Sequence, residues 1–313
     1  MGLTTNQLRM IRALAENRIA DAKKYAVFCC LEDQTKKNEY EVRRCRALLE
    51  NGGRNFLELP ANLNGILRME DVSDFREGRY YLGEREQRVF EHIEQTNRMS
   101  MRLLELGIPY LNSTLLYGKP GTGKTMFGRY TAYKLGLPFA YVNFSYLIDS
   151  YMGNTSKNLK KVFDFCKGKR CVLMLDKVDC IGLKRSGGGD GAGGELARTT
   201  ISLIQELDSL TNEQIVIGAT NREDRLDPAL KRRFFQREEF TVYDESEREK
   251  MARKFLDDVG IKYDPSEIQG YAREKRTQAE MIQFATQLVI RNVMHDTESE
   301  TKYKGQSYEQ REQ

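Results

Sequence analysis

With 313 residues, the chain can hold one large domain and one or two smaller ones, and its 40% apolar residues suffice to build a core. Its 31% charged residues predict a soluble protein, and a formal net charge of only +4, from many charges of both signs, argues against a nucleic-acid-binding face. The sequence has no apolar run long enough to span a membrane and no C-x-x-C pair for structural zinc, so free thiols and a cytoplasmic location are expected.

The N-terminal part, residues 1–52, is predicted to be a helical hairpin. Apolar residues recur at spacings of three and four over residues 6–31, and a second helical stretch covers about 35–50 before Asn51-Gly52-Gly53. Two such helices cannot easily bury a core alone. Packing against the rest of the chain or a neighbouring copy and docking of a partner both stay open. Residues 53–80, punctuated by Pro60, Gly65 and Gly78, are predicted to be a linker.

Residues 81–243 are predicted to form an α/β domain. A long helix over 81–106 precedes short apolar strands that alternate with helices, a pattern typical of a parallel sheet covered on both faces. The five expected strands are 113–117, 139–144, 171–175, 215–219 and 239–242. The helices expected between them are 126–135, 156–166 and 195–210. Beyond them, helices at 247–257, 265–271 and 278–294 predict a small all-helical domain over 244–295, followed by a polar tail, 296–313, predicted to be disordered.

A phosphate-binding loop follows the first of these strands. The spacing G-x-x-x-x-G-K-T is complete, and it lies between a predicted strand and a predicted helix. Glycines let the loop point its N–H groups inward as an anion-binding nest beside a positive helix end. Lys124 can reach the β- and γ-phosphates of a nucleotide, and the Thr125 hydroxyl can ligate Mg²⁺. The expected nucleotide-binding residues of this loop are Gly118, Pro120, Gly121, Thr122, Gly123, Lys124, Thr125 and Met126.

A second carboxylate is needed to hold Mg²⁺ beside such a loop, usually at the end of a neighbouring buried strand. The apolar run 171–175 ends at Asp176, which is therefore the expected partner of Thr125 in binding the metal. ATP and Mg²⁺ are the cofactors that these two motifs predict.

With these motifs, the chain resembles the AAA ATPase family over about residues 80–295, particularly its spastin- and katanin-like, protein-remodelling members. Residues 217–221, Ile-Gly-Ala-Thr-Asn, resemble the polar sensor strand, and residues 226–234, Leu-Asp-Pro-Ala-Leu-Lys-Arg-Arg-Phe, are similar to the arginine-finger segment. Residues 150–153, Ser-Tyr-Met-Gly, resemble the aromatic pore loop. The fold that this resemblance implies is an AAA+ P-loop NTPase, with a parallel five-stranded sheet flanked by helices and a small helical lid.

The resemblance also implies how the protein works. Family members assemble into rings, usually hexamers, that hold ATP between neighbouring subunits and remodel a protein client. Asn221 would lie near the γ-phosphate and the attacking water, and Arg232 and Arg233 would act in trans on the neighbour's nucleotide. The pore loop Tyr151, Met152 and Gly153 would grip extended polypeptide, and the N-terminal helices would recruit the client.

Two departures from the family stand out. Residues 277–280, Thr-Gln-Ala-Glu, replace a Ser-Gly-Ala-Asp-like lid segment. Lys177 stands where the family places the glutamate that polarises the attacking water, and a protonated lysine offers no acceptor for that proton. Asp179 is not an obvious substitute, because the family often has an acid there as well. We expect slow hydrolysis, which fits either a naturally inactive subunit or a trapped form of an active enzyme.

Three functions therefore stay open: a protein-remodelling ATPase, a nucleotide-locked scaffold or regulatory subunit, and a DNA-handling AAA+ protein. The aromatic pore loop and the lack of a basic cluster favour the first over the third, and Lys177 is the feature that favours the second.

Overall fold

The computed structural model describes residues 2–16, 18–33, 35, 38–50, 59–108, 110–144, 147, 155–181, 192–210 and 214–309. The chain forms two compact units, Met1–Leu59 and Pro60–Gln313, each described here by itself. Among the described residues, no helix combines the length and the apolar character needed to cross a membrane.

In the N-terminal unit, the described residues form three helices, α1 (Thr5–Ala15), α2 (Ile19–Glu32) and α3 (Glu39–Glu50). The prediction of one helix over 6–31 is wrong, because the chain leaves the helix after α1. The Glu16 N–H closes the last turn on the Arg12 carbonyl, and Arg18 has a non-helical backbone. The Arg18 guanidinium then bridges Glu16 and Asp21 across the break, so local ion pairing stabilises the turn.

The second unit is built on a six-stranded mixed sheet with the order β1-β3-β4-β5-β2-β6. Five neighbouring strands run parallel, and β1 pairs antiparallel with β3 at one edge. The strands are β1 (Leu67–Glu70), β2 (Asn112–Tyr117), β3 (Phe139–Asn143), β4 (Cys171–Asp176), β5 (Gln214–Thr220) and β6 (Gln236–Glu239).

Five strands run parallel, as the sequence predicts, but the sheet differs from that prediction in two features. Strand β1 lies within residues 53–80, the predicted linker. The sequence does not reveal it, because its four residues are too few and too polar to show a strand pattern. The last strand covers Gln236–Glu239 and not 239–242. It is a polar edge strand whose side chains alternate between half-buried and exposed, so its apolar content does not mark it.

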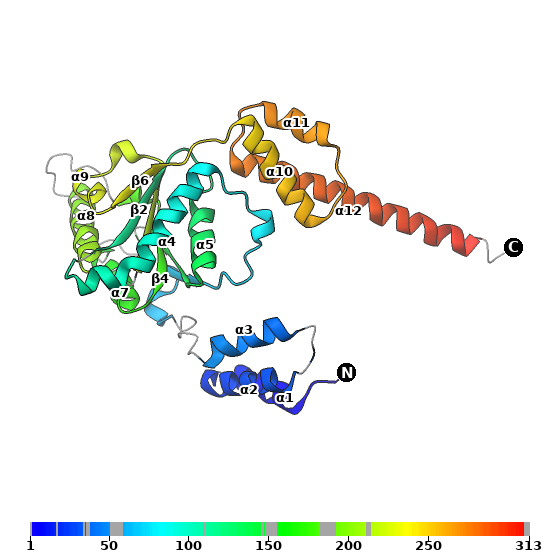
Figure 1. Ribbon diagram of the computed structural model, residues 1–313, viewed down its shortest axis with the longest axis horizontal. Helices are drawn as coiled ribbons and strands as arrows, with labels where there is room; N and C mark the ends of the chain where they lie inside the picture. Colours follow the sequence, from blue (N-terminus) through cyan, green and yellow to red (C-terminus); the bar gives the residue numbers. More distant parts are fainter. Residues whose placement is uncertain are drawn as a thin grey trace. The chain divides into compact units, whose positions relative to one another are not determined.

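Helices cover both faces of this sheet. The pair α4 (Glu84–Glu105) and α5 (Lys124–Leu135) covers one face, and α7 (Thr155–Cys166) and α8 (Ala192–Asp208) cover the other (Figure 1). Val89 and Ile93 of α4 and Phe127 of α5 pack with Met174 and Ile217 of the central strands in one buried cluster. Short helical turns complete this part: η1 (Ala61–Leu63), η2 (Glu77–Arg79), η3 (Val178–Cys180), η4 (Glu223–Arg225) and α9 (Pro228–Lys231).

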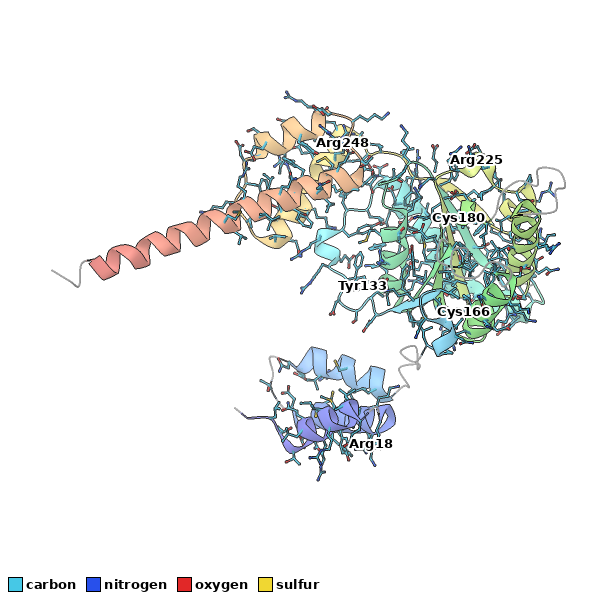
Figure 2. The ribbon with its side chains drawn as sticks, turned by 180° about the vertical axis from the view of Figure 1, so that it is seen from behind. Arg18, Tyr133, Cys166, Cys180, Arg225 and Arg248 are labelled. Carbon is cyan, nitrogen blue, oxygen red and sulfur yellow. The ribbon has the colours of Figure 1, made fainter. Side chains whose placement is uncertain are left out.

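The last three helices, α10 (Glu245–Val259), α11 (Pro265–Arg273) and α12 (Gln278–Glu309), share a separate apolar core. Buried Arg248, labelled in Figure 2, ties this bundle together by donating to the carbonyl oxygens of Ala272 and Tyr243. Helix α12 runs on to Glu309 and so extends into residues 296–313, for which the sequence predicts a disordered tail. The stretch has no proline, and polar composition alone does not end a helix.

Candidate nucleotide site

The phosphate loop lies at the carboxyl edge of the sheet. Strand β2 lies between β5 and β6, with Tyr117 opposite Thr220, so the loops that begin at Gly118 and Asn221 leave the sheet side by side. In an open α/β sheet, this edge is where ligands bind. The register therefore brings the predicted sensor residue next to the phosphate loop.

Glycine at position 118 is required by both conformation and space. Its φ is +135°, and a Cβ there would lie 2.2 Å from the Phe240 carbonyl oxygen. Gly121 and Gly123 also have positive φ, at +80° and +87°. These conformations favour glycine and let the loop curve tightly before α5 begins at Lys124.

Lys124 is buried, and its ammonium group contacts its own loop. Its Nζ donates to the carbonyl oxygens of Gly118 and Lys119, both at 2.8 Å, and to the Thr122 hydroxyl at 3.3 Å. Burial lowers the pKa of Lys124 to about 8, although the negative charges of Asp176 and Asp179 oppose the shift. A ligand with phosphate charge would favour the protonated form.

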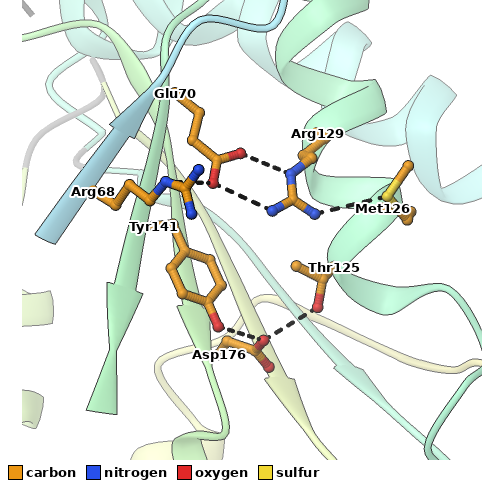
Figure 3. A network of polar contacts seen from close by, with 7 residues as sticks. All are labelled: Arg68, Glu70, Thr125, Met126, Arg129, Tyr141 and Asp176. Atoms are coloured by element: carbon orange, nitrogen blue, oxygen red, sulfur yellow. Dashed lines mark hydrogen bonds and ion pairs between the residues drawn. The ribbon is translucent and has the colours of Figure 1, made fainter. Parts of the chain in front are cut away.

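The two predicted metal ligands converge (Figure 3). The Thr125 hydroxyl at the start of α5 lies 3.2 Å from Oδ2 of Asp176, which ends β4. Two hard oxygen ligands fit Mg²⁺, which commonly takes one or two protein oxygens and completes its shell with water and phosphate. Among the described residues, no three acidic, histidine or cysteine side chains gather as a metal site.

Lys177 has an unusual backbone. Its φ of 56° and ψ of 46° are left-handed, and it is the one residue other than glycine with positive φ in the described ranges. The Lys177 N–H donates to Oδ1 of Asp176 at 2.8 Å, while the side chain is exposed. Nearby, Asp179 accepts a 2.6 Å hydrogen bond from the Thr220 hydroxyl, which links it to the end of β5. Asn221 follows directly and is exposed.

The two predicted arginine fingers have different surroundings. Arg233 donates through Nε and Nη2 to Asp208, both at 2.9 Å, and through Nη1 to the Ala229 carbonyl at 3.2 Å. The Arg232 side chain is exposed, and its guanidinium has no hydrogen bond or ion pair to any residue that the structure describes. Of the two guanidinium groups, only that of Arg232 is therefore left without a contact within the described part of the chain.

Two predicted loop residues, the lid segment and the predicted pore loop remain to be placed. Pro120 and Met126 are exposed at the phosphate loop and at the first turn of α5. The lid segment meets the loop directly, because the Ala279 N–H donates to the Gly121 carbonyl at 3.0 Å. There Thr277 and Glu280 form a reciprocal capping pair at the start of α12. The predicted pore loop, Tyr151, Met152 and Gly153, lies outside the described residues.

Sequence reasoning missed Tyr141, whose hydroxyl donates to Oδ2 of Asp176 at 3.0 Å. Burial, and next the negative charge of Asp176, raise the pKa of Tyr141 to about 12, so the hydroxyl stays a donor at neutral pH. The signal that points to it is its place on β3, the parallel neighbour of β4. That signal becomes usable only when the strand order is known.

Comparison with known proteins adds the following. Residues 114–242 match the family described as ATPase family associated with various cellular activities (AAA). The chain is 30% identical over 258 residues to the uncharacterized AAA family ATPase y4kL of Sinorhizobium fredii, an alignment that covers 77% of this chain and 76% of that protein. It is 36% identical over 154 residues to the 26S proteasome regulatory subunit 10B homolog A of Arabidopsis thaliana, covering 48% of this chain and 39% of the relative. It is also 36% identical over 134 residues to the ATP-dependent zinc metalloprotease FtsH 3 of Symbiobacterium thermophilum, covering 42% and 21%. The chain thus spans less than half of the length of these last two relatives.

Proposed function

Because the chain belongs to the AAA family of ATPases, we propose that it binds ATP with Mg²⁺ between the subunits of a ring and acts on a protein client. The observation that carries the proposal is the meeting of Lys124, Thr125 and Asp176 at the carboxyl edge of the sheet, beside the glycine loop. Lys124 would pair with the β- and γ-phosphates. Thr125 and Asp176 would hold Mg²⁺, which when bound neutralises phosphate charge.

Hydrolysis by this chain is proposed to be slow. Lys177 has three donors and no acceptor when protonated, so it cannot take the proton of an attacking water. Asp179 is already bonded to Thr220, which supports a role in holding the sensor strand and not in activating water. Asn221 would orient the water beside the γ-phosphate. The scaffold or regulatory role stays the second candidate because Lys177 favours a chain that holds ATP without turning it over.

The nucleotide site is proposed to be completed by a neighbouring copy, in a ring that we take to be a homohexamer. Arg232 supports this arrangement, since it is exposed and not engaged by the described part of its own chain. A guanidinium placed against the neighbour's γ-phosphate would stabilise the charge that develops during transfer.

The client is proposed to be an extended polypeptide, gripped by Tyr151, Met152 and Gly153 and recruited by the N-terminal helices. The relatives named as proteasome regulatory subunits and as an ATP-dependent protease support handling of protein. Leu8, Ile11 and Leu14 are exposed on α1 and offer apolar contact. The six cysteines are all free thiols, which supports action in the cytoplasm.

Calorimetric titration of the full chain with ATP tests the nucleotide site. Lys124→Ala removes the buried ammonium and should weaken binding by about 10- to 150-fold, the effect of losing a charged hydrogen bond worth about 1.5–3 kcal/mol. Lys119→Ala is the matched control, because it removes a positive charge from the same loop at an exposed side chain and should change little. Unchanged ATP affinity in Lys124→Ala would refute the site.

A further inference from the structure

Asp176 is held by more donors than metal binding alone requires. Its Oδ1 accepts from the Lys177 N–H at 2.8 Å, and its Oδ2 accepts from Tyr141 at 3.0 Å and from Thr125 at 3.2 Å (Figure 3). Thr125 is the one of these three that would itself ligate Mg²⁺. The other two donors fix the carboxylate from the side of the protein.

We propose that Tyr141 is a positioning residue for Mg²⁺: its hydroxyl holds the Asp176 carboxylate in the orientation that faces Thr125. This inference rests on the proposed function, because it assigns a task to a residue beside the same site. Hydrogen bonds to a ligating carboxylate orient it and tune the metal, and removing such a partner typically costs about 10- to 100-fold in metal affinity.

The strand register explains why Tyr141 can reach the carboxylate. Strands β3 and β4 run parallel, with Tyr141 opposite Met174 and Asn143 opposite Asp176. Tyr141 therefore lies two residues before the level of the carboxylate on the neighbouring strand, and its long side chain spans that distance. A phenylalanine there would keep the ring but lose the one hydrogen-bond donor of the Tyr141 side chain.

The surroundings of Tyr141 are also fixed. Arg129 on α5 pairs with Glu70 of β1 through Nε at 2.8 Å and Nη2 at 3.3 Å, and its guanidinium lies 5.5 Å from the centre of the Phe139 ring. Phe139 and Tyr141 are on the same face of β3, with ring centres 6.4 Å apart. The Arg129–Glu70 pair thus closes the side of the network that faces away from Asp176 (Figure 3). The Tyr141 ring is half-buried and packs beside Phe139, which restricts where its hydroxyl can lie.

The test measures ATP affinity of the full chain by calorimetry, once with Mg²⁺ and once with EDTA. Tyr141→Phe should weaken binding about tenfold with Mg²⁺ and leave it unchanged with EDTA. The Mg²⁺ concentration needed for half-maximal binding at fixed ATP should rise by the same factor. Tyr263→Phe is the matched control: it also removes a tyrosine–carboxylate hydrogen bond, to Asp257 at 2.6 Å, but Tyr263 lies between α10 and α11. Tyr263→Phe should change the ATP affinity neither with Mg²⁺ nor with EDTA.

The outcomes separate failure of the role proposed for Tyr141 from failure of the proposed function. An equal loss of ATP affinity in Tyr141→Phe with Mg²⁺ and with EDTA would show a general packing role and overturn the inference. An unchanged ATP affinity under both conditions would also overturn it. Either result, with ATP binding that still depends on Lys124, leaves the proposed function standing. If the unmodified chain binds no ATP under either condition, the proposed function fails and the inference fails with it.

Discussion

Arg232 and Arg233 are adjacent in sequence, but the structure predicts opposite consequences for their replacement by alanine. Arg233 uses all three nitrogens of its guanidinium on Asp208 and Ala229, which ties the segment after α9 to the end of α8. Arg232 makes no such contact within the described part of the chain, and its side chain is exposed. Arg233→Ala should therefore affect folding, and Arg232→Ala should affect chemistry.

The magnitudes follow from these contacts. The Arg233–Asp208 pair is about one third to one half exposed, so solvent screens it, and its loss should cost about 1 kcal/mol or less in free energy of unfolding. For a unit of this size, that corresponds to a melting temperature lower by about 2–4 °C. Arg232→Ala should stay within about 0.5 kcal/mol of the unmodified chain. Its effect on turnover should be about 10³- to 10⁵-fold if it completes the neighbour's site.

Thermal unfolding and ATP turnover of both variants, in a Lys177→Glu background that restores hydrolysis, measure these effects. Turnover should also depend on protein concentration, since the proposed site is completed by a second subunit. This assignment of the two arginines is refuted if Arg232→Ala keeps full turnover while Arg233→Ala loses it without loss of stability. It is also refuted if dilute monomer hydrolyses ATP as fast as assembled protein.

Three further predictions follow. Phosphate charge should raise the pKa of Lys124 from about 8, so ATP binding takes up a proton above that pH. The ATP affinity should be steady below about pH 8 and then fall by up to about tenfold per pH unit. Calorimetry should not find this slope in Lys124→Ala. Gly118→Ala should destabilise the chain by about 4 kcal/mol or more because its Cβ meets the Phe240 carbonyl, whereas Gly123→Ala, with open space around its Cβ, should cost only about 1–2 kcal/mol; denaturant midpoints compare the two. Tyr151→Ala should abolish work on a protein client and spare ATP hydrolysis, and a client that crosslinks everywhere except near residues 151–153 would contradict threading.

The sequence predicts the phosphate loop well because its constraints are local. Positive φ at Gly118 and the cation at Lys124 depend on residues within a few positions of each other, so spacing alone reveals them. The buried parallel strands are also visible, since each contains a short run of apolar residues. Their buried side chains carry the signal that edge strands lack.

What the sequence does not reveal depends on partners distant in the chain. Strand β1 exists because Leu67–Glu70 pairs with β3, more than sixty positions away, and its own residues show no strand pattern. The same pairing brings Glu70 to Arg129. Tyr141 is invisible for a related reason: its role depends on the register of β3 against β4, which no local pattern contains.

The central claim is that the chain binds ATP but hydrolyses it slowly because Lys177 cannot accept the water's proton. Lys177→Glu should leave the free energy of unfolding unchanged, because the side chain is exposed and the left-handed backbone at this position costs glutamate as much as lysine. It supplies a general base, an effect typically worth about 10²- to 10⁴-fold in rate, or about 3–5 kcal/mol of barrier. Lys177→Gln, which offers no base, is the matched control.

Steady-state ATP hydrolysis by the unmodified chain, Lys177→Glu and Lys177→Gln, at equal ATP saturation, tests this claim most directly. We predict that Lys177→Glu turns over ATP at least about 10²-fold faster than the other two, with similar ATP affinity in all three. Equal turnover by the unmodified chain and Lys177→Glu would mean that another residue activates the water, and it would contradict the account.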